Sequence, residues 1–374
     1  MRADGPEQHL IKQGTPTMGG VVILVALAIT CLVMGRLTAE LALVLIATLA
    51  TGVLGLIDDL TSVTHGRSLG LTPHAKMIGL TLICVLFCLL SINWCGVEPV
   101  VRFPGGLSVD LGVLTTTVDI AGEPFHIPWL YMIFTWLLIV GLSNAVNLTD
   151  GLDGLACGVS TISAISMLVI ALLVSESDVA LVMAALVGAC LGFMPYNKNP
   201  AKMFMGDTGS TFLGYILATI SIQGLFKYYA IVSFAVPFLI LGLPMFDTLF
   251  AIIRRLAHGQ NPMAPDRGHI HHRLIDMGLN QKQAVAALYV ISSILGLSAV
   301  MLTSSGAIKA MLFLMALAVA AFLASRVIFR RDIDRALQAE KAAAEEKSTE
   351  TATPAETVPA EPEEESNEKK KEEA

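Results

Sequence analysis

Long blocks of apolar residues alternate with short polar segments along most of the chain. Ten blocks approach or reach the roughly 20 residues that a helix needs to cross a hydrocarbon core about 30 Å thick. They lie at 18–35, 41–57, 76–94, 128–146, 157–174, 179–195, 211–225, 230–247, 284–303 and 308–329. Because a chain in lipid must satisfy its own backbone hydrogen bonds, each block predicts a helix. The pattern predicts an all-α polytopic membrane protein with about ten transmembrane helices.

The segment 95–127 breaks this pattern. It contains the alternating stretches LSVDLGVL and TTVDIAG. Alternation of apolar and polar residues with a period of two is typical of strands. The segment therefore predicts a small extracytoplasmic β-hairpin.

Composition and charge support a membrane protein. Apolar residues make up 54% of the chain and charged residues 15%, which excludes an ordinary soluble enzyme, a disordered chain and a collagen. The net charge of −7 arises near the C-terminus, where residues 332–374 hold 14 Asp and Glu against 6 Lys and Arg. We predict a membrane-embedded domain over 1–335 and an acidic, low-complexity, disordered cytoplasmic tail over 336–374. We expect no nucleic-acid partner.

Lysine and arginine are distributed unequally between the two sides of the predicted bundle. With the N-terminus inside, fifteen of them fall in inside segments and four in outside segments. Short cytoplasmic loops carry the excess of Lys and Arg. Both termini are therefore predicted to be cytoplasmic.

Polar residues gather at the predicted cytoplasmic ends of the spans. Carboxylates at such positions are costly and usually mark function. The five clusters are Asp58 and Asp59; Asn144, Asn147, Asp150 and Asp153; Asp207; Asp247; and His269, His271 and His272. A solvated helix end would explain any one cluster, but it does not explain five on one side.

Phosphoryl transfer is the chemistry that these residue types suit. Mg²⁺ binds through one or two carboxylates together with substrate phosphates, and Lys76 and the histidines can neutralise a diphosphate. The HIHH spacing does not match the i, i+4 pair of a helical zinc site, so a phosphate- or nucleotide-contacting loop is favoured. A secondary transporter, which would place charges near the midplane of two repeated halves, fits less well, as does a non-catalytic scaffold.

Several long motifs, in order along the chain, make it resemble the polyprenyl-phosphate N-acetylhexosamine-1-phosphate transferases. The motifs are GTPTMGG (14–20), GLIDD (55–59), GLTPHAK (70–76), NAVNLTDGLDGLA (144–156), NPAKMFMGDTGS (199–210), FDTLFAIIRR (246–255) and APDRGHIHHRL (264–274). This resemblance implies an Mg²⁺-dependent enzyme of the bacterial cell membrane that joins a sugar-1-phosphate from a UDP-sugar to undecaprenyl phosphate and releases UMP.

The resemblance also implies roles for individual residues. Catalytic roles fall on Asp58, Asp59, Lys76 and Asp207. Asp207 and Asn147 are expected to hold the metal. Substrate-binding roles fall on Asn144, Asn147, Asp150, Asp153, Asp247, Arg267, His269, His271 and His272.

The two branches of this family differ in the sugar that they transfer. The N-terminal motifs resemble the phospho-N-acetylmuramoyl-pentapeptide transferases, whereas residues 199–274 resemble the undecaprenyl-phosphate N-acetylglucosaminyl-1-phosphate transferases. The second resemblance favours UDP-GlcNAc as donor and the first membrane step of a cell-envelope glycan, such as teichoic acid or O-antigen, as the function. Transfer of phospho-N-acetylmuramoyl-pentapeptide is the alternative. The expected partners are UDP-GlcNAc, undecaprenyl phosphate, membrane lipid and a second copy of the chain in a homodimer.

Overall fold

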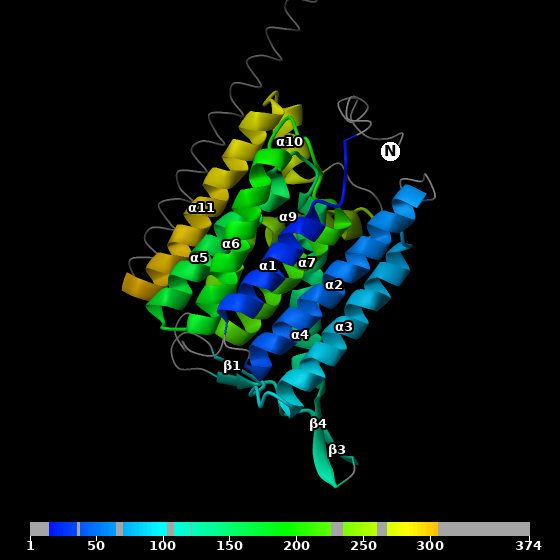
Figure 1. Ribbon diagram of the computed structural model, residues 1–374, viewed down its shortest axis with the longest axis vertical. Coiled ribbons are helices and arrows are strands. Elements are labelled where there is room, and N and C mark those ends of the chain that lie inside the picture. The colour runs from blue at the N-terminus through cyan, green and yellow to red at the C-terminus, as the bar shows by residue number, and fades with distance from the viewer. Residues whose placement is uncertain are drawn as a thin grey trace, which may run out of the picture. The chain divides into compact units, whose positions relative to one another are not determined.

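The computed structural model describes residues 15–35, 38–64, 70–102, 108–120, 122–225, 235–259 and 268–305. The chain divides into two units, Met1–Phe313 and Leu314–Ala374, and every described residue belongs to the first. The described part is mostly helical (Figure 1). The predicted tail, the apolar run 308–329 and Arg267 lie outside it.

Six helices of the described part are long and apolar enough to cross a membrane. They are α2 (Ala39–Thr64), α3 (Pro73–Asn93), α4 (Trp129–Thr149), α5 (Leu155–Leu173), α6 (Ser177–Asn197) and α11 (Gln281–Ser305). Two further predicted spans correspond to the shorter helices α1 (Gly20–Met34) and α7 (Gly206–Ile220), and α7 continues into a π-helical turn, Ser221–Leu225.

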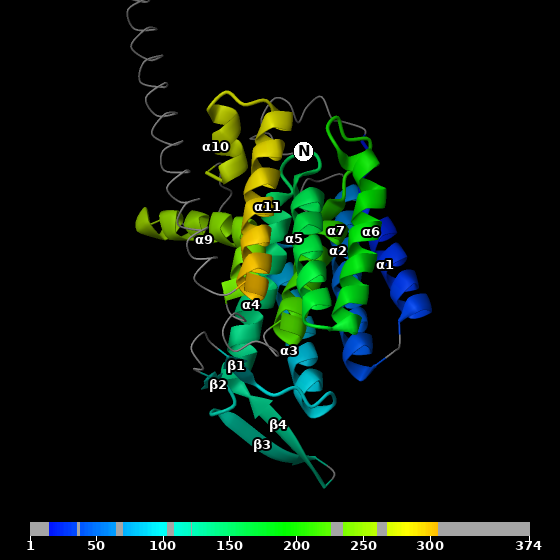
Figure 2. The ribbon, with the colours of Figure 1, turned by 90° about the vertical axis from the view of Figure 1, so that its left-hand side faces the viewer.

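The predicted span 230–247 is wrong as a single helix. In its described part, α8 (Ala235–Ile240) ends before α9 (Gly242–Ala257) begins, and α9 runs across the axes of α5 and α11 (Figure 2). Pro244 explains the break because it has no N–H to donate to the carbonyl of Ile240, four residues earlier. Ser163 of α5 donates its hydroxyl to that carbonyl instead, at 3.0 Å.

Two antiparallel strand pairs lie between α3 and α4. β1 (Val100–Arg102) pairs with β2 (Ser108–Asp110), and β3 (Thr115–Ile120) pairs with β4 (Glu123–Pro128). The two alternating stretches recognised in the sequence therefore do not pair with each other. Gly122, with φ of +89°, follows β3, and its N–H donates to Asp119 Oδ1, so the chain turns back there and places β4 beside β3.

Helix α7 forms the centre of the core. It contacts α1, α2, α4 and α5, and each residue from 208 to 220 is buried (Figure 1). By contrast, α1, α2 and α3 each expose large apolar side chains such as Val22, Ile46 and Leu82, as expected for faces turned to lipid. The short helix α10 (Ile270–Asp276) packs against α11.

Candidate active site

Four polar side chains from four helices meet near the start of α7. The Lys76 ammonium of α3 lies 2.6 Å from Asp207 Oδ2 and 3.1 Å from Asp58 Oδ2. The Asn147 amide of α4 donates from Nδ2 to Asp207 Oδ1 at 2.7 Å. Asp58 is buried, whereas the Asp207 side chain is 38% exposed and can meet a ligand. The ammonium offsets part of the repulsion between the two carboxylates.

Asp59 has a different environment from its neighbour Asp58. Its carboxylate accepts hydrogen bonds from Asp207 N at 2.9 Å, from Thr208 N at 2.9 Å and from Thr208 Oγ1 at 2.6 Å. A carboxylate at a helix N-terminus satisfies unpaired N–H groups and interacts favourably with the helix dipole. Asp59 thus caps α7 from α2 and holds the Asp207 backbone in place.

The segment 16–20, part of the GTPTMGG motif, also fixes the start of α7. Phe204 N donates to Pro16 O at 2.8 Å, Gly19 N donates to Phe204 O at 2.9 Å, and Gly20 N donates to Met205 O at 2.8 Å. A Cβ on Gly20 would overlap the backbone of Gly209 in α7. The motif therefore acts through its main chain, and a glycine is required where α1 meets α7.

Gly20→Ala should lower both stability and turnover. The added methyl group meets backbone that cannot rotate away, and overpacking of this kind costs about 1–3 kcal/mol. A small displacement of Asp207 can cost about 100-fold in rate. Thermal unfolding and turnover of the purified variant should both be measured.

Gly141→Ala in α4 is the matched control, because nothing lies within 4 Å of a Cβ at that position. It should be neutral, or stabilising by up to about 1 kcal/mol. Equal behaviour of the two variants would contradict the role assigned to the 16–20 segment.

The loop between α4 and α5 brings two further carboxylates to the same region. Asp153 is buried and accepts hydrogen bonds from Asn199 Nδ2 at 2.9 Å and from Ala201 N at 3.1 Å, so it holds the loop that leads to α7. Burial and the negative charges of Asp207, Asp59 and Asp153 raise the pKa of Asp150 to about 7. Asn144 donates to Val140 O within its own helix at 2.7 Å.

The rings of three histidines lie together at the start of α10. Asp247 of α9 accepts a hydrogen bond from Ile270 N at 2.8 Å, and its other carboxylate oxygen lies 2.9 Å from His269 Nδ1. His269 and His271 are stacked with ring centroids 5.8 Å apart, and His272 lies 4.2 Å from His271 by the same measure. His271 Nε2 occupies the space that a side chain on Gly151 would need, so the histidines touch the α4–α5 loop.

Known proteins similar to this chain identify its family. A family model described as "Glycosyl transferase family 4" matches residues 41–225. A Bacillus subtilis protein named probable undecaprenyl-phosphate N-acetylglucosaminyl 1-phosphate transferase is 36% identical over 291 residues, which are 78% of this chain and 74% of that relative. The chain belongs to glycosyl transferase family 4. The family predicted from the motifs is confirmed.

Other family 4 relatives carry the name of the second branch. A model described as phospho-N-acetylmuramoyl-pentapeptide-transferase signature 1 matches residues 12–24. A phospho-N-acetylmuramoyl-pentapeptide-transferase of Bacillus velezensis is 43% identical over 227 residues, 59% of this chain and 65% of that relative. One from Desulforamulus reducens is 33% identical over 306 residues, 79% of this chain and 84% of that relative.

The donor set of this family 4 site fits Mg²⁺ bound together with a substrate. Among the described residues, no three Asp, Glu, His or Cys form a cluster able to hold a metal by themselves. Mg²⁺ does not need such a cluster, since it binds through one or two carboxylates, keeps several waters and bridges to phosphates. The part-exposed Asp207 supplies such a carboxylate.

Several residues that support the site were not predicted from the sequence. Tyr289 of α11 donates its hydroxyl to Gly154 O at 2.6 Å, and Gln281 accepts a hydrogen bond from Asn199 at 2.8 Å. Asn199 lies within a recognised motif and could have been selected on that ground. Tyr289 lies inside an apolar run, where nothing in the pattern distinguishes it from a lipid-facing aromatic residue.

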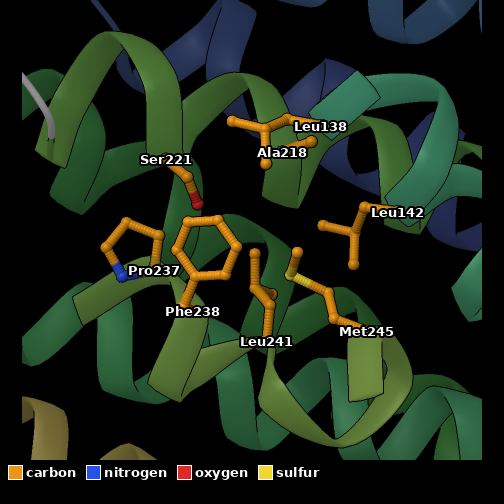
Figure 3. Close-up of a pocket in the computed structure, with 8 residues that line it drawn as sticks. All are labelled: Leu138, Leu142, Ala218, Ser221, Pro237, Phe238, Leu241 and Met245. Carbon is orange, nitrogen blue, oxygen red and sulfur yellow. The ribbon is translucent and has the colours of Figure 1, made fainter. Parts of the chain in front are cut away.

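An apolar pocket lies beside α4 (Figure 3). It is lined by Leu138 and Leu142 of α4, Ala218 of α7, and Phe238, Leu241 and Met245 of the α8–α9 region, together with Ser221 and Pro237. Its cavity volume is about 10 Å³, room for about one water molecule. Leu142 is five residues from Asn147, or about 7.5 Å along the helix. The pocket therefore offers apolar surface within reach of the site.

Proposed function

We propose that this family 4 chain transfers N-acetylglucosamine-1-phosphate from UDP-GlcNAc to undecaprenyl phosphate and releases UMP. The observation that supports this function best is the contact of Lys76 with both Asp58 and Asp207, beside Asn147. A cation between two carboxylates at helix ends suits a reaction in which negatively charged phosphates must approach each other. The name of the Bacillus subtilis relative supports the choice of donor and acceptor.

In the proposed reaction, an oxygen of the lipid phosphate attacks the β-phosphorus of the nucleotide sugar. A P–O bond forms there, and the bond from that phosphorus to the oxygen bridging to the α-phosphate breaks, so that UMP leaves with the bond's electron pair. A phosphate dianion is already a competent nucleophile, so a covalent intermediate on Asp58 or Asp59 is unnecessary. Asp59 is further restricted by its cap on α7.

The residues in and around the cluster of Asp58, Lys76, Asn147 and Asp207 would position the substrates. Lys76 would pair with phosphate oxygens, and Asp207, with Asn147 beside it, would hold Mg²⁺. When bound, Mg²⁺ would neutralise charge that develops on the diphosphate. The α4–α5 loop with Asp150 would face the soluble nucleotide sugar, as would His269, His271 and His272.

The apolar residues around the pocket would contact part of the polyprenyl chain of the acceptor. A polyprenyl phosphate must place its phosphate among charged groups while its hydrocarbon stays out of water, and the pocket lies next to the helix that carries Asn147. We further propose that the site and both termini are cytoplasmic, that the protein acts as a homodimer, and that it begins the synthesis of a cell-envelope glycan.

Transfer of phospho-N-acetylmuramoyl-pentapeptide is the second candidate function. The match to the muramoyl-pentapeptide signature at 12–24 and the relative that is 43% identical favour it. The donor of that reaction carries a peptide beside its sugar. The two candidates share the reaction and differ in the donor, that is, in the sugar and in the peptide attached to it.

A donor assay distinguishes the two candidates. Purified protein should receive undecaprenyl phosphate, Mg²⁺ and each UDP-sugar in turn, and UMP release should be measured. We expect turnover with UDP-GlcNAc and little or none with UDP-MurNAc-pentapeptide. Faster turnover of the pentapeptide would reverse the choice of sugar, whereas absence of UMP with every donor would contradict the proposed reaction.

A further inference from the structure

The first three turns of α11 contact three parts of the candidate site. The helix packs against α10, which carries the histidines, and against α5 (Figure 2). Its first residue, Gln281, accepts a hydrogen bond from Asn199 of the α6–α7 loop at 2.8 Å. Further along α11, Tyr289 donates its hydroxyl to Gly154 O, at the end of the α4–α5 loop, at 2.6 Å. One helix therefore connects α10 with the loops that lead into α5 and α7.

A small apolar cluster lies between the same parts of the chain. It is separate from the main core, and part-buried residues of α10 pack against it. Because it includes a residue of the α4–α5 loop, apolar contacts hold that loop in addition to the Tyr289 hydroxyl. Its buried members from the loop, α5 and α11 are Leu152, Leu155, Val159, Ala284, Val285 and Leu288.

Tyr289 reaches the α4–α5 loop across a glycine of α5. A Cβ on Gly158 would overlap the hydroxyl and the ring of Tyr289, so the ring fits only because position 158 has no side chain. Gly154 is the N-cap of α5 and has a φ of +79°, a left-handed conformation that favours glycine. Its carbonyl accepts both from Tyr289 Oη and from Gly158 N, the latter at 2.9 Å. The tyrosine thus binds the residue at which the loop becomes helix.

The start of α11 is itself fixed by a reciprocal pair of hydrogen bonds. Asn280 N donates to Gln283 Oε1 at 3.0 Å, and Gln283 N donates to Asn280 Oδ1 at 2.9 Å. Such a capping box satisfies N–H groups that the first turn of a helix leaves unpaired. The residues that hold the two loops therefore lie on a capped helix.

We infer that α11 holds the α4–α5 loop in the position that binds the nucleotide-sugar donor, and that Tyr289 is the positioning residue. This inference rests on the proposed function, in which Asp150 of that loop and the histidines of α10 face the donor. His271 lies against Gly151 of the loop. Because the loop and α10 are both attached to α11, that helix sets the spacing between the two groups of donor-facing residues.

The residues proposed to act on the phosphates are supported separately. Asn147 donates from Nδ2 to Asp207 Oδ1 at 2.7 Å and to Ser210 Oγ at 2.8 Å, and neither partner belongs to the α4–α5 loop or to α11. Loss of the Tyr289 hydroxyl should therefore weaken donor binding and leave the chemical step nearly unchanged.

Steady-state kinetics of Tyr289→Phe test this expectation. The variant keeps the ring, and its KM for the donor that the parent protein uses should rise about fivefold, the factor that one hydrogen bond of ordinary net strength represents. The kcat and the KM for undecaprenyl phosphate should stay within about twofold of the parent values. A mere loss of folded protein would instead lower the apparent kcat and leave both KM values unchanged. An unchanged donor KM, or equal rises in the two KM values, would overturn the inference.

Matched variants examine the same contact from both sides. Tyr196→Phe, at an exposed tyrosine of α6, should retain the parent KM values. Gly158→Ala should displace the ring of Tyr289 and raise the donor KM at least as far as Tyr289→Phe does. Gly188→Ala is its control, since nothing lies within 4 Å of a Cβ at that position of α6. A Gly158→Ala variant with the parent donor KM would contradict the role of the tyrosine.

Hydrogen–deuterium exchange tests the support of the loop without an activity assay. In the full-length protein in phosphatidylcholine nanodiscs, amides of residues 150–158 should exchange at least about fivefold faster in Tyr289→Phe than in the parent or in Tyr196→Phe, while those of 129–143 should not change. Parent-like exchange over 150–158 would overturn the inference and leave the proposed function standing. If the parent turns over no donor, the proposed function fails, while the exchange still decides whether Tyr289 holds the loop.

Discussion

Asp207→Asn should abolish most of the transferase activity while leaving the fold intact. The carboxamide has the same shape but cannot supply the negative charge that would hold Mg²⁺ beside a diphosphate. We expect a loss of about 1000-fold in kcat, comparable to removing a principal electrostatic contact in other enzymes. The fold should survive because the Asp207 backbone N–H, which Asp59 accepts, is unchanged.

The measurement is UMP release over a range of Mg²⁺ concentrations, accompanied by thermal unfolding. Asp276→Asn is the matched control, since Asp276 is an exposed carboxylate at the end of α10. It should retain parent activity. Near-parent turnover of Asp207→Asn at ordinary Mg²⁺ would remove Asp207 from the metal site.

Lys76→Met should damage stability as well as activity. Methionine keeps most of the side chain's length but leaves Asp58 and Asp207 without the cation that lies within 3.1 Å of both. Removing one partner of a buried ion pair costs about 3–5 kcal/mol, and we expect about 2–4 kcal/mol here because Asp207 is partly solvated. Turnover should fall at least about 100-fold, since charge stabilisation at the phosphates is lost.

Unfolding of the Lys76→Met variant should be followed in EDTA, so that a bound divalent cation does not compensate for the missing ammonium. Lys202→Met, which removes an exposed lysine from the loop before α7, is the control and should change the stability by less than about 0.5 kcal/mol. A Lys76→Met variant as stable as this control would show that the ion pairs to Lys76 contribute little.

Much of the candidate site could be predicted from the sequence because each of its motifs lies at a helix end. Asp58, Asn147 and Asp207 are far apart in sequence, and the alternation of spans assigns all three to one membrane face. The structure brings them together through Lys76 and Asn147. Predicting that these residues lie close together required only the correct membrane side and the correct ends of the spans.

The different roles of Asp58 and Asp59 could not be predicted. Adjacent residues on a helix point about 100° apart, so Asp58 and Asp59 reach different groups at the start of α7. Which of the two caps α7 depends on how α2 is rotated about its axis against α7, and a single sequence contains no record of that rotation. The structure assigns the cap to Asp59 and the ion pair to Asp58.

The sequence does indicate the break between α8 and α9, although hydropathy alone does not reveal it. The run 230–247 is apolar apart from Ser233 and the final Asp247. Pro244 interrupts it, and the apolar residues after Pro244 recur at helical spacing on one face. That spacing is typical of an amphipathic helix and not of a membrane span. The pairing of the strands in 95–127 could not be predicted, because alternation identifies strands without identifying their partners.

The enclosure of α7 has a consequence for the order in which the protein is assembled. Its thirteen residues from 208 to 220 are all buried, and they include Thr208, Ser210, Thr211 and Thr219, which a lone helix would present to acyl chains. The helices that surround it, α1, α2, α4 and α5, all precede it in the chain. Because synthesis starts at the N-terminus, the helices that enclose α7 are made before it. Asp207, at the start of α7, is therefore made after its partners Lys76 and Asn147.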